Sequence, residues 1–344
     1  MRRFIYICFC LLMIACSKES TLESRINLDE LYVIQDDPDD PVKHRIYEIY
    51  ETYGIPVYFN DTIGRIFLKT DVHGQPVYQY EKLDLAWGYD SYKKLEYHYQ
   101  YITDPEKQLE VLTWIGQYLR DADKALFPFC FFVPESVTTK NLDNREVTEV
   151  DQQFMIGFRT LTMIMGNWEG ENPGDILLNM KRNMVTQKIK NYSEDLAYFN
   201  KISDANWYGT KYWSEVDNTI TTYWNCDVLN PDYTGSLTGE ALEEQRVEAR
   251  AVTGRFGFVM GDEWGGGLFT PYDTQRDLEC FVKVILATGS DEVFREQWGT
   301  YPLVMEKYEV VYEIITEKLG VELENGYYEK DHIYIIRNVG VVVL

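Results

Sequence analysis

The sequence has few of the cysteine and histidine patterns that mark metal sites or disulfide-rich folds. Of the 6 cysteines in 344 residues, only Cys130, Cys226 and Cys280 lie beyond the first 16 positions. Three cysteines exclude a disulfide framework and allow one pair at most, and no Cys-x-x-Cys follows residue 16 to suggest a zinc ribbon. None of the 4 histidines has another three or four residues away, so none forms a helical metal pair; they are His44, His73, His98 and His332.

Positive charge is also scarce. The chain has 33 lysines and arginines against 56 aspartates and glutamates, which gives a net charge of −23. So acidic a surface repels phosphate groups, which excludes nucleic acid and anionic lipid as partners. The phosphate-binding loop, the dinucleotide fingerprint and the Gly-x-Ser-x-Gly nucleophile motif are absent as well.

The sequence contains no apolar run long enough to span a bilayer, which takes ~20 residues. The longest run covers residues 4–15 and follows Arg2 and Arg3, as in a secretory signal peptide. The run ends in Ala15 before Cys16, which resembles the lipobox of bacterial lipoproteins, so Cys16 is the expected lipidation site. We therefore expect an outer-membrane lipoprotein held by its lipid, on the periplasmic or the cell-surface face. The alternative is an ordinary signal peptide that happens to contain cysteines.

Periodicity and turn signals predict an α+β fold, with a mixed N-terminal sheet and helices, and a mainly helical C-terminal subdomain around a cleft. Strands are expected at 55–59, 65–70 and 127–137, with one or two more in 153–166. Helices are expected at 105–122, 176–189, 240–251, 275–288, 291–297 and 302–318. The predicted divisions are a signal peptide (1–15), a lipidated tether (16–44), an N-terminal α/β subdomain (45–170), the helical subdomain (171–323) and a β-type tail (324–344).

Several stretches between residues 45 and 323 together resemble one family. They are "YEIYETYGIPVYFND", "LEVLTWIGQYLRDA", "FFVPESV", "GEALEE", "LFTPYDTQRDLECFVKVIL" and "YPLVMEKYEVVYEIITEKLGVEL". In this order they are similar to the zinc-binding metallopeptidase lipoproteins of Bacteroidetes. The resemblance implies a zincin-like fold, in which one helix carries His-Glu-x-x-His and an acidic ligand follows a Thr-Pro-Tyr loop.

The metal ligands of that family are missing here. The motif aligns with "NMVTQ" (183–187), so that Asn183 and Gln187 replace the two histidines and Met184 replaces the glutamate. Neutral amides are poor zinc ligands, and methionine cannot act as a base. The acidic position falls on Glu279 or Cys280. We therefore expect a degenerate site without metal or cofactor; a plain core helix and an unconventional metal site are the alternatives.

The predicted function is non-catalytic binding of a peptide, a protein or a glycan in the former cleft. The expected cleft walls are residues 207–233 and 262–272, where aromatic rings could stack on a ligand. The candidate rings are Trp207, Trp213, Trp224 and Trp264. The alternative is an active hydrolase, either a metallopeptidase with non-standard ligands or a glycosidase that uses two carboxylates.

Overall fold

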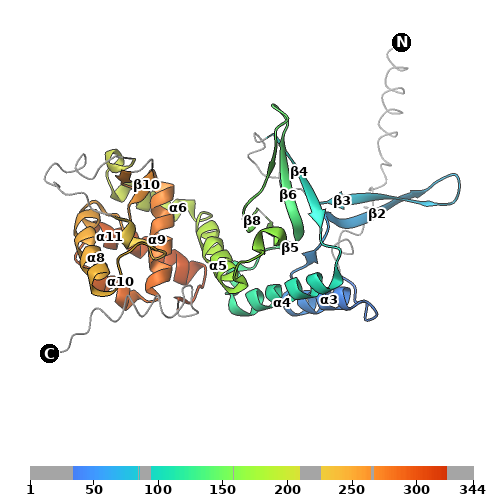
Figure 1. Cartoon of the computed structure of the whole chain (residues 1–344), viewed down its shortest axis with the longest axis horizontal. Helices are drawn as coiled ribbons and strands as arrows, with labels where there is room; N and C mark the ends of the chain where they lie inside the picture. Colours follow the sequence, from blue (N-terminus) through green and yellow to red (C-terminus); the bar gives the residue numbers. More distant parts are fainter. Residues whose placement is uncertain are drawn as a thin grey trace, which may run out of the picture.

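The computed structural model describes residues 34–83, 85, 94–157, 159–209, 226–264 and 267–323 (Figure 1). The fold is a mixed α+β arrangement, which confirms the predicted class. Several predicted features lie outside the described residues: the signal peptide, Cys16, most of the tether, the C-terminal tail, Trp213 and Trp224.

The N-terminal half is built on a four-stranded sheet. Its order is β1 (Val57–Tyr58), β5 (Cys130–Phe132), β9 (Thr160–Met163) and β8 (Phe154–Ile156). The first three strands are parallel, and β8 is antiparallel to β9. The sheet is therefore mixed, as predicted, and β8 forms one of its edges.

Two smaller sheets adjoin it. One contains β4 (Leu95–Tyr101), β6 (Pro134–Asn141) and β7 (Val147–Glu149); the other is the hairpin of β2 (Thr62–Thr70) and β3 (Pro76–Lys82), which projects from the body (Figure 1). The prediction of one strand over 127–137 was wrong, because the stretch contributes β5 to one sheet and β6 to another. Pro134 stands at the break, and a proline has no N–H with which to continue the hydrogen bonding of β5.

Three helices begin with the same device. Asp40, Asp104 and Asn172 accept backbone N–H groups at the starts of α3 (Pro41–Tyr53), α4 (Pro105–Asp121) and α5 (Pro173–Ile189). Proline follows each cap, where its missing N–H costs nothing. The predicted end of the tether at residue 44 was therefore wrong, since α3 begins at Pro41. Gly54, with a φ of 75°, ends α3 in the left-handed conformation that favours glycine.

The C-terminal half is mainly helical. Its helices are α6 (Ser193–Ile202), α8 (Gly239–Thr253), α9 (Thr274–Thr288), α10 (Asp291–Trp298) and α11 (Pro302–Glu313). A π-helical turn (Ile314–Lys318) continues α11, within the single helix predicted at 302–318. A short hairpin joins β10 (Asp262–Trp264) to β11 (Gly267–Phe269). The 3₁₀ turns are Lys124–Leu126, Met165–Trp168, Ala205–Trp207, Cys226–Leu229 and Gly254–Phe256.

One hydrophobic core runs through both halves. It includes residues of α3, α4, β5 and β9 on one side and of α9 and α11 on the other, and α5 lies between the two groups (Figure 1). Helix α5 contributes Met180, Met184, Val185 and Ile189, all buried. Helix α5 is therefore held by packing on several sides. Within the described residues, no helix is both long and apolar enough to cross a membrane.

Candidate functional site

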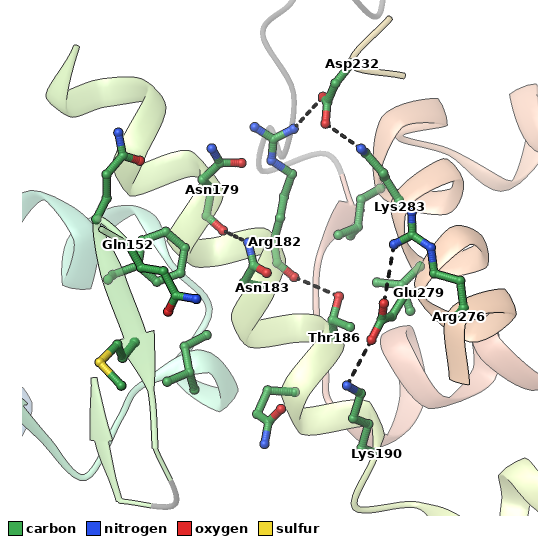
Figure 2. A pocket seen from close by; sticks show the side chains of 17 residues that line it. Gln152, Asn179, Arg182, Asn183, Thr186, Lys190, Asp232, Arg276, Glu279 and Lys283 are labelled. Atoms are coloured by element: carbon green, nitrogen blue, oxygen red, sulfur yellow. Dashed lines mark hydrogen bonds and ion pairs between the residues drawn. The ribbon is translucent and has the colours of Figure 1, made fainter. Parts of the chain in front are cut away.

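A cavity of about 610 Å³ lies where β8, α5 and α9 meet (Figure 2). Its size falls in the range of ~300–1,000 Å³ found for ligand pockets. Asn183, Gln187 and Glu279, three of the positions predicted from the sequence, all line it. The structure thus brings together residues that are almost 100 positions apart in the chain.

Helix α5 presents a row of amides to the cavity. Asn179, Asn183 and Gln187 are spaced four residues apart, so they lie on one face of the helix. The Asn183 amide donates to the carbonyl oxygen of Asn179 at 2.8 Å. Met184, by contrast, is 2% exposed and belongs to the core. At the expected glutamate position there is therefore a packing residue that does not line the cavity.

Helix α9 forms the opposite wall. Glu279 faces the cavity, whereas Cys280 is buried. Of the two alternatives for the acidic position, only Glu279 lies at the site. Cys130 and Cys280 do not form a disulfide with one another.

The two acids of the cavity each lie between two cations. Asp232 accepts from Arg182 at 3.1 Å and from Lys283 at 2.6 Å. Glu279 is 3.1 Å from Lys190 and 3.5 Å from Arg276. In each triad one cation comes from α5 or from Lys190 at its C-terminal cap, and the other comes from α9, so each carboxylate links these two elements (Figure 2).

The surroundings of Glu279 favour its ionised form. Burial by itself would raise the pKa of this carboxyl group. Hydrogen bonds from Lys190 and Gln275, together with the charges of Lys190 and Arg276, outweigh that effect and lower the pKa below its usual value. Glu279 therefore stays an acceptor at neutral pH and is no proton donor.

The residues present do not fit a zinc ion. Asn183 and Gln187 offer neutral amides, and Glu279 is engaged by two cations whose charge opposes a divalent metal. In the part of the chain that the structure describes, no group of three or more His, Cys, Asp or Glu side chains could hold a metal ion. The two positions that align with the histidines of the family motif thus carry neutral amides in this chain.

The third wall is the edge of the sheet. Consecutive residues from Gln152 to Ile156 line the cavity. Neighbouring side chains of a strand point to opposite faces, so a consecutive run means that the cavity lies along the edge of β8. The Gln153 carbonyl and the Gly157 N–H bond to the β9 side. By alternation, Phe154 and Ile156 direct their backbone groups towards the open edge.

Of the tryptophans predicted to bind a ligand, Trp207 lies outside this cavity. Trp207 is half-buried and packs edge-on against Phe256 at 5.2 Å, and it is not among the residues that line the cavity. Trp264 lies in β10, and the remaining two candidates fall outside the described residues. Among the residues of the two predicted walls that the structure describes, Asp232 is the one that lines the cavity.

The four cations that line the cavity among the described residues were not predicted from the sequence as site residues. Arg182 and Thr186 on α5 and Lys190 at its C-terminal cap repeat at four-residue intervals, which was a signal that the polar side of this helix extends beyond the motif. No such signal linked Asp232 or Lys283 to them, because these contacts join distant segments.

A second cluster of charged groups is closed to solvent. The Lys307 ammonium donates to Asp277 at 2.5 Å and to the carbonyl of Gly257 at 2.9 Å, and the Tyr208 hydroxyl donates to the same Asp277 oxygen at 2.9 Å. Both ionic side chains are fully buried, and four aromatic rings surround the ammonium: Phe199, Tyr208, Phe258 and Phe281. With no access for a ligand, the cluster acts as an internal cross-link between α9 and α11.

Comparisons of this chain with protein-family models, with curated proteins and with solved structures find no match.

Proposed function

We propose that this chain is a non-catalytic lipoprotein of the outer membrane or cell surface, with a degenerate zincin-like metallopeptidase fold. In this proposal the cavity between β8, α5 and α9 binds a peptide, a protein segment or a glycan. Lipid on Cys16 anchors the protein to the membrane.

The observation that carries the proposal is that the positions aligned with the family's metal ligands lie together in the structure. Asn183, Gln187 and Glu279 line one cavity, as the alignment with the family requires, yet the first two offer only neutral amides and the carboxylate of Glu279 is paired with two cations. A helix that had never carried a site would have no reason to place these positions in a cavity together with the acid from α9. The surroundings support retained binding without retained catalysis.

Among the ligands, an extended peptide is the one that the edge of β8 favours. Phe154 and Ile156 direct backbone donors and acceptors along the cavity wall, where a peptide can add to the sheet as a further strand. The amides of α5 then face the opposite side of that peptide and can bond to its backbone.

The hydrolase alternatives lack support at this site. A metallopeptidase needs ligands for its metal, and the cations around Glu279 oppose one. A glycosidase needs one carboxyl group that holds a proton near neutral pH. Glu279 has a lowered pKa, and Asp232 is held by Arg182 and Lys283.

Metal analysis of the mature chain, purified from membranes in detergent, tests the non-catalytic part. We expect less than stoichiometric zinc after growth with added zinc, and no cleavage of a mixed peptide substrate. Glu279→Ala should leave the metal content unchanged. Stoichiometric zinc that this substitution abolishes would refute the proposal.

A peptide and glycan binding screen on the same preparation tests the binding part. Binding should be lost on Asn183→Trp, which fills the cavity from an exposed position on α5, and should persist in Lys201→Gln, an exposed change on α6 outside the cavity. A protein that binds neither class of ligand would contradict the proposal.

A further inference from the structure

A second cavity, of about 590 Å³, lies where the parallel strands β1, β5 and β9 begin. Among the described residues it shares no lining residue with the cavity beside α5. Three parts of the fold enclose it: the end of α3, the base of the β2–β3 hairpin, and the segments that lead into β5 and β9. Its volume also falls in the range of ~300–1,000 Å³ found for ligand pockets. It is therefore a candidate binding site that the proposed function does not use.

The walls of this second cavity are mainly aromatic and aliphatic. The side chains that supply them include Tyr50, Tyr58, Ile63, Leu83, Leu85 and Phe129. Phe129 is 63% exposed, so its ring stands at the opening of the cavity and not in the core. An apolar ligand that covers this ring removes apolar area from water, which favours binding. The walls therefore suit a ligand with an aromatic ring, which can also stack on the rings of the protein.

A guanidinium group stands at the same opening. The Arg159 guanidinium lies 5.8 Å from the centre of the Phe129 ring, and both residues line the second cavity. Burial raises the pKa of the Cys130 thiol, and the charge of Arg159 acts in the opposite direction, which places the guanidinium near the thiol as well. An aromatic ring, a cation and a thiol thus lie together where β5 and β9 begin.

Within the described residues, the Arg159 guanidinium makes no ion pair with a carboxylate. The other charged residues that line the second cavity, Glu81 and Lys82, belong to β3, and Lys82 pairs with Asp61 at 3.0 Å. The hairpin follows β1, whereas Arg159 precedes β9, and β5 lies between these two strands. Arg159 and Glu81 therefore reach the cavity from different elements, and a ligand can supply the carboxylate that Arg159 lacks.

We propose that the second cavity binds a small aromatic carboxylic acid. The ring of the ligand packs between the apolar walls and Phe129, and its carboxylate accepts hydrogen bonds from Arg159. Arginine suits this role because its planar guanidinium can donate two parallel N–H bonds to one carboxylate. The inference is independent of the ligand proposed for the cavity beside α5.

Isothermal titration calorimetry with naphthoate tests the site, on the mature chain in lipid nanodiscs and with empty nanodiscs as background. Naphthoate should bind about tenfold tighter than the uncharged naphthamide of the same shape, as expected of a charge-assisted hydrogen bond. Heat no greater than that of empty nanodiscs would overturn the inference. Equal affinity for the two compounds would overturn it as well, because the carboxylate would then have no partner in the protein.

Arg159 and Phe129 are both exposed, so they can be substituted without disturbing the core. Arg159→Gln should lower the affinity for naphthoate about tenfold and leave that for naphthamide unchanged. Arg120→Gln, an exposed change on α4 outside both cavities, is the matched control and should alter neither affinity. Phe129→Ala should weaken the binding of both compounds, because it removes the ring that both contact. Naphthoate that binds Arg159→Gln as tightly as the wild type would contradict the assignment.

The Cys130 thiol, which lines the second cavity, reports where the ligand binds. Saturating naphthoate should slow the alkylation of Cys130 by iodoacetamide, measured by mass spectrometry of the peptide that contains it, because the bound ring covers the thiol. An unchanged rate would place the ligand elsewhere and overturn the inference. Asn183→Trp, which fills the cavity beside α5, should leave naphthoate binding intact. Loss of binding in that variant would mean that naphthoate occupies the cavity beside α5 instead.

Discussion

Two acids on helix α9, Asp277 and Glu279, lie in opposite environments although only one residue separates them. Two positions amount to about 200° of rotation around a helix, so the side chains lie on opposite faces. Asp277 is fully buried beside Lys307, and its pKa is raised because desolvation outweighs the attraction of that lysine. Glu279 is 28% exposed between two cations, and its pKa is lowered.

The two faces of α9 thus place ion pairs in opposite settings, one inside the core and the other at the cavity. The buried pair is closed to solvent and ringed by aromatic side chains, and the Lys307 ammonium also donates to the Tyr208 hydroxyl and to the Gly257 carbonyl. The ion pairs of the cavity are partly exposed to solvent. Helix α5 repeats the division, with Met184 in the core and Asn183 and Gln187 at the cavity.

The largest expected effect is on the buried face of α9. Asp277→Asn or Lys307→Met alone should lower the free energy of unfolding by roughly 3–5 kcal/mol, because each leaves the charge of the other side chain buried without its partner. The double variant should lose much less than the sum of the two. Urea unfolding of the four proteins measures this coupling, and additive losses would show that the two side chains act independently.

A somewhat smaller loss is expected from the core face of α5. Met184→Ala should cost ~2–5 kcal/mol, since it leaves a cavity in a packed interior. Gln187→Ala, on the cavity face of the same helix, should change stability by less than about 0.5 kcal/mol. Equal losses in thermal or urea unfolding would mean that the two faces of α5 are not distinct.

The smallest effect concerns the pH dependence of Glu279. Because its pKa is lowered in the folded state, the ionised carboxylate contributes stability above the usual glutamate pKa, and this contribution is lost as the pH falls through the folded value. The difference in unfolding free energy between the wild type and Glu279→Gln should therefore shrink between about pH 5 and pH 3. A difference that is constant over this range would contradict the charged triad.

Local signals in the sequence were enough for most of the helices. Helix α9 was predicted within one residue of its start, because Asp273 caps it and Gly289 ends it in the left-handed conformation. The break between β5 and β6 was missed, since the apolar run continues through Val133 and only the partner strands differ.

The site was predictable only in part. The positions of Asn183, Gln187 and Glu279 followed from the alignment, and they do share a cavity. The contacts of Asp232 could not be predicted, because they reach Arg182 and Lys283 across 50 and 51 positions of the chain. Similarly, the contact of Asp277 with Lys307 depends on how α9 packs against α11, which no local pattern encodes.

The shared core has a consequence for how the molecule melts. Because α5 packs on both halves, neither half can lose its structure without exposing apolar surface of the other. The two halves therefore form one thermodynamic unit, which should absorb heat in a single calorimetric transition. A truncation between β9 and α5 would then yield two fragments that expose apolar surface and do not fold independently.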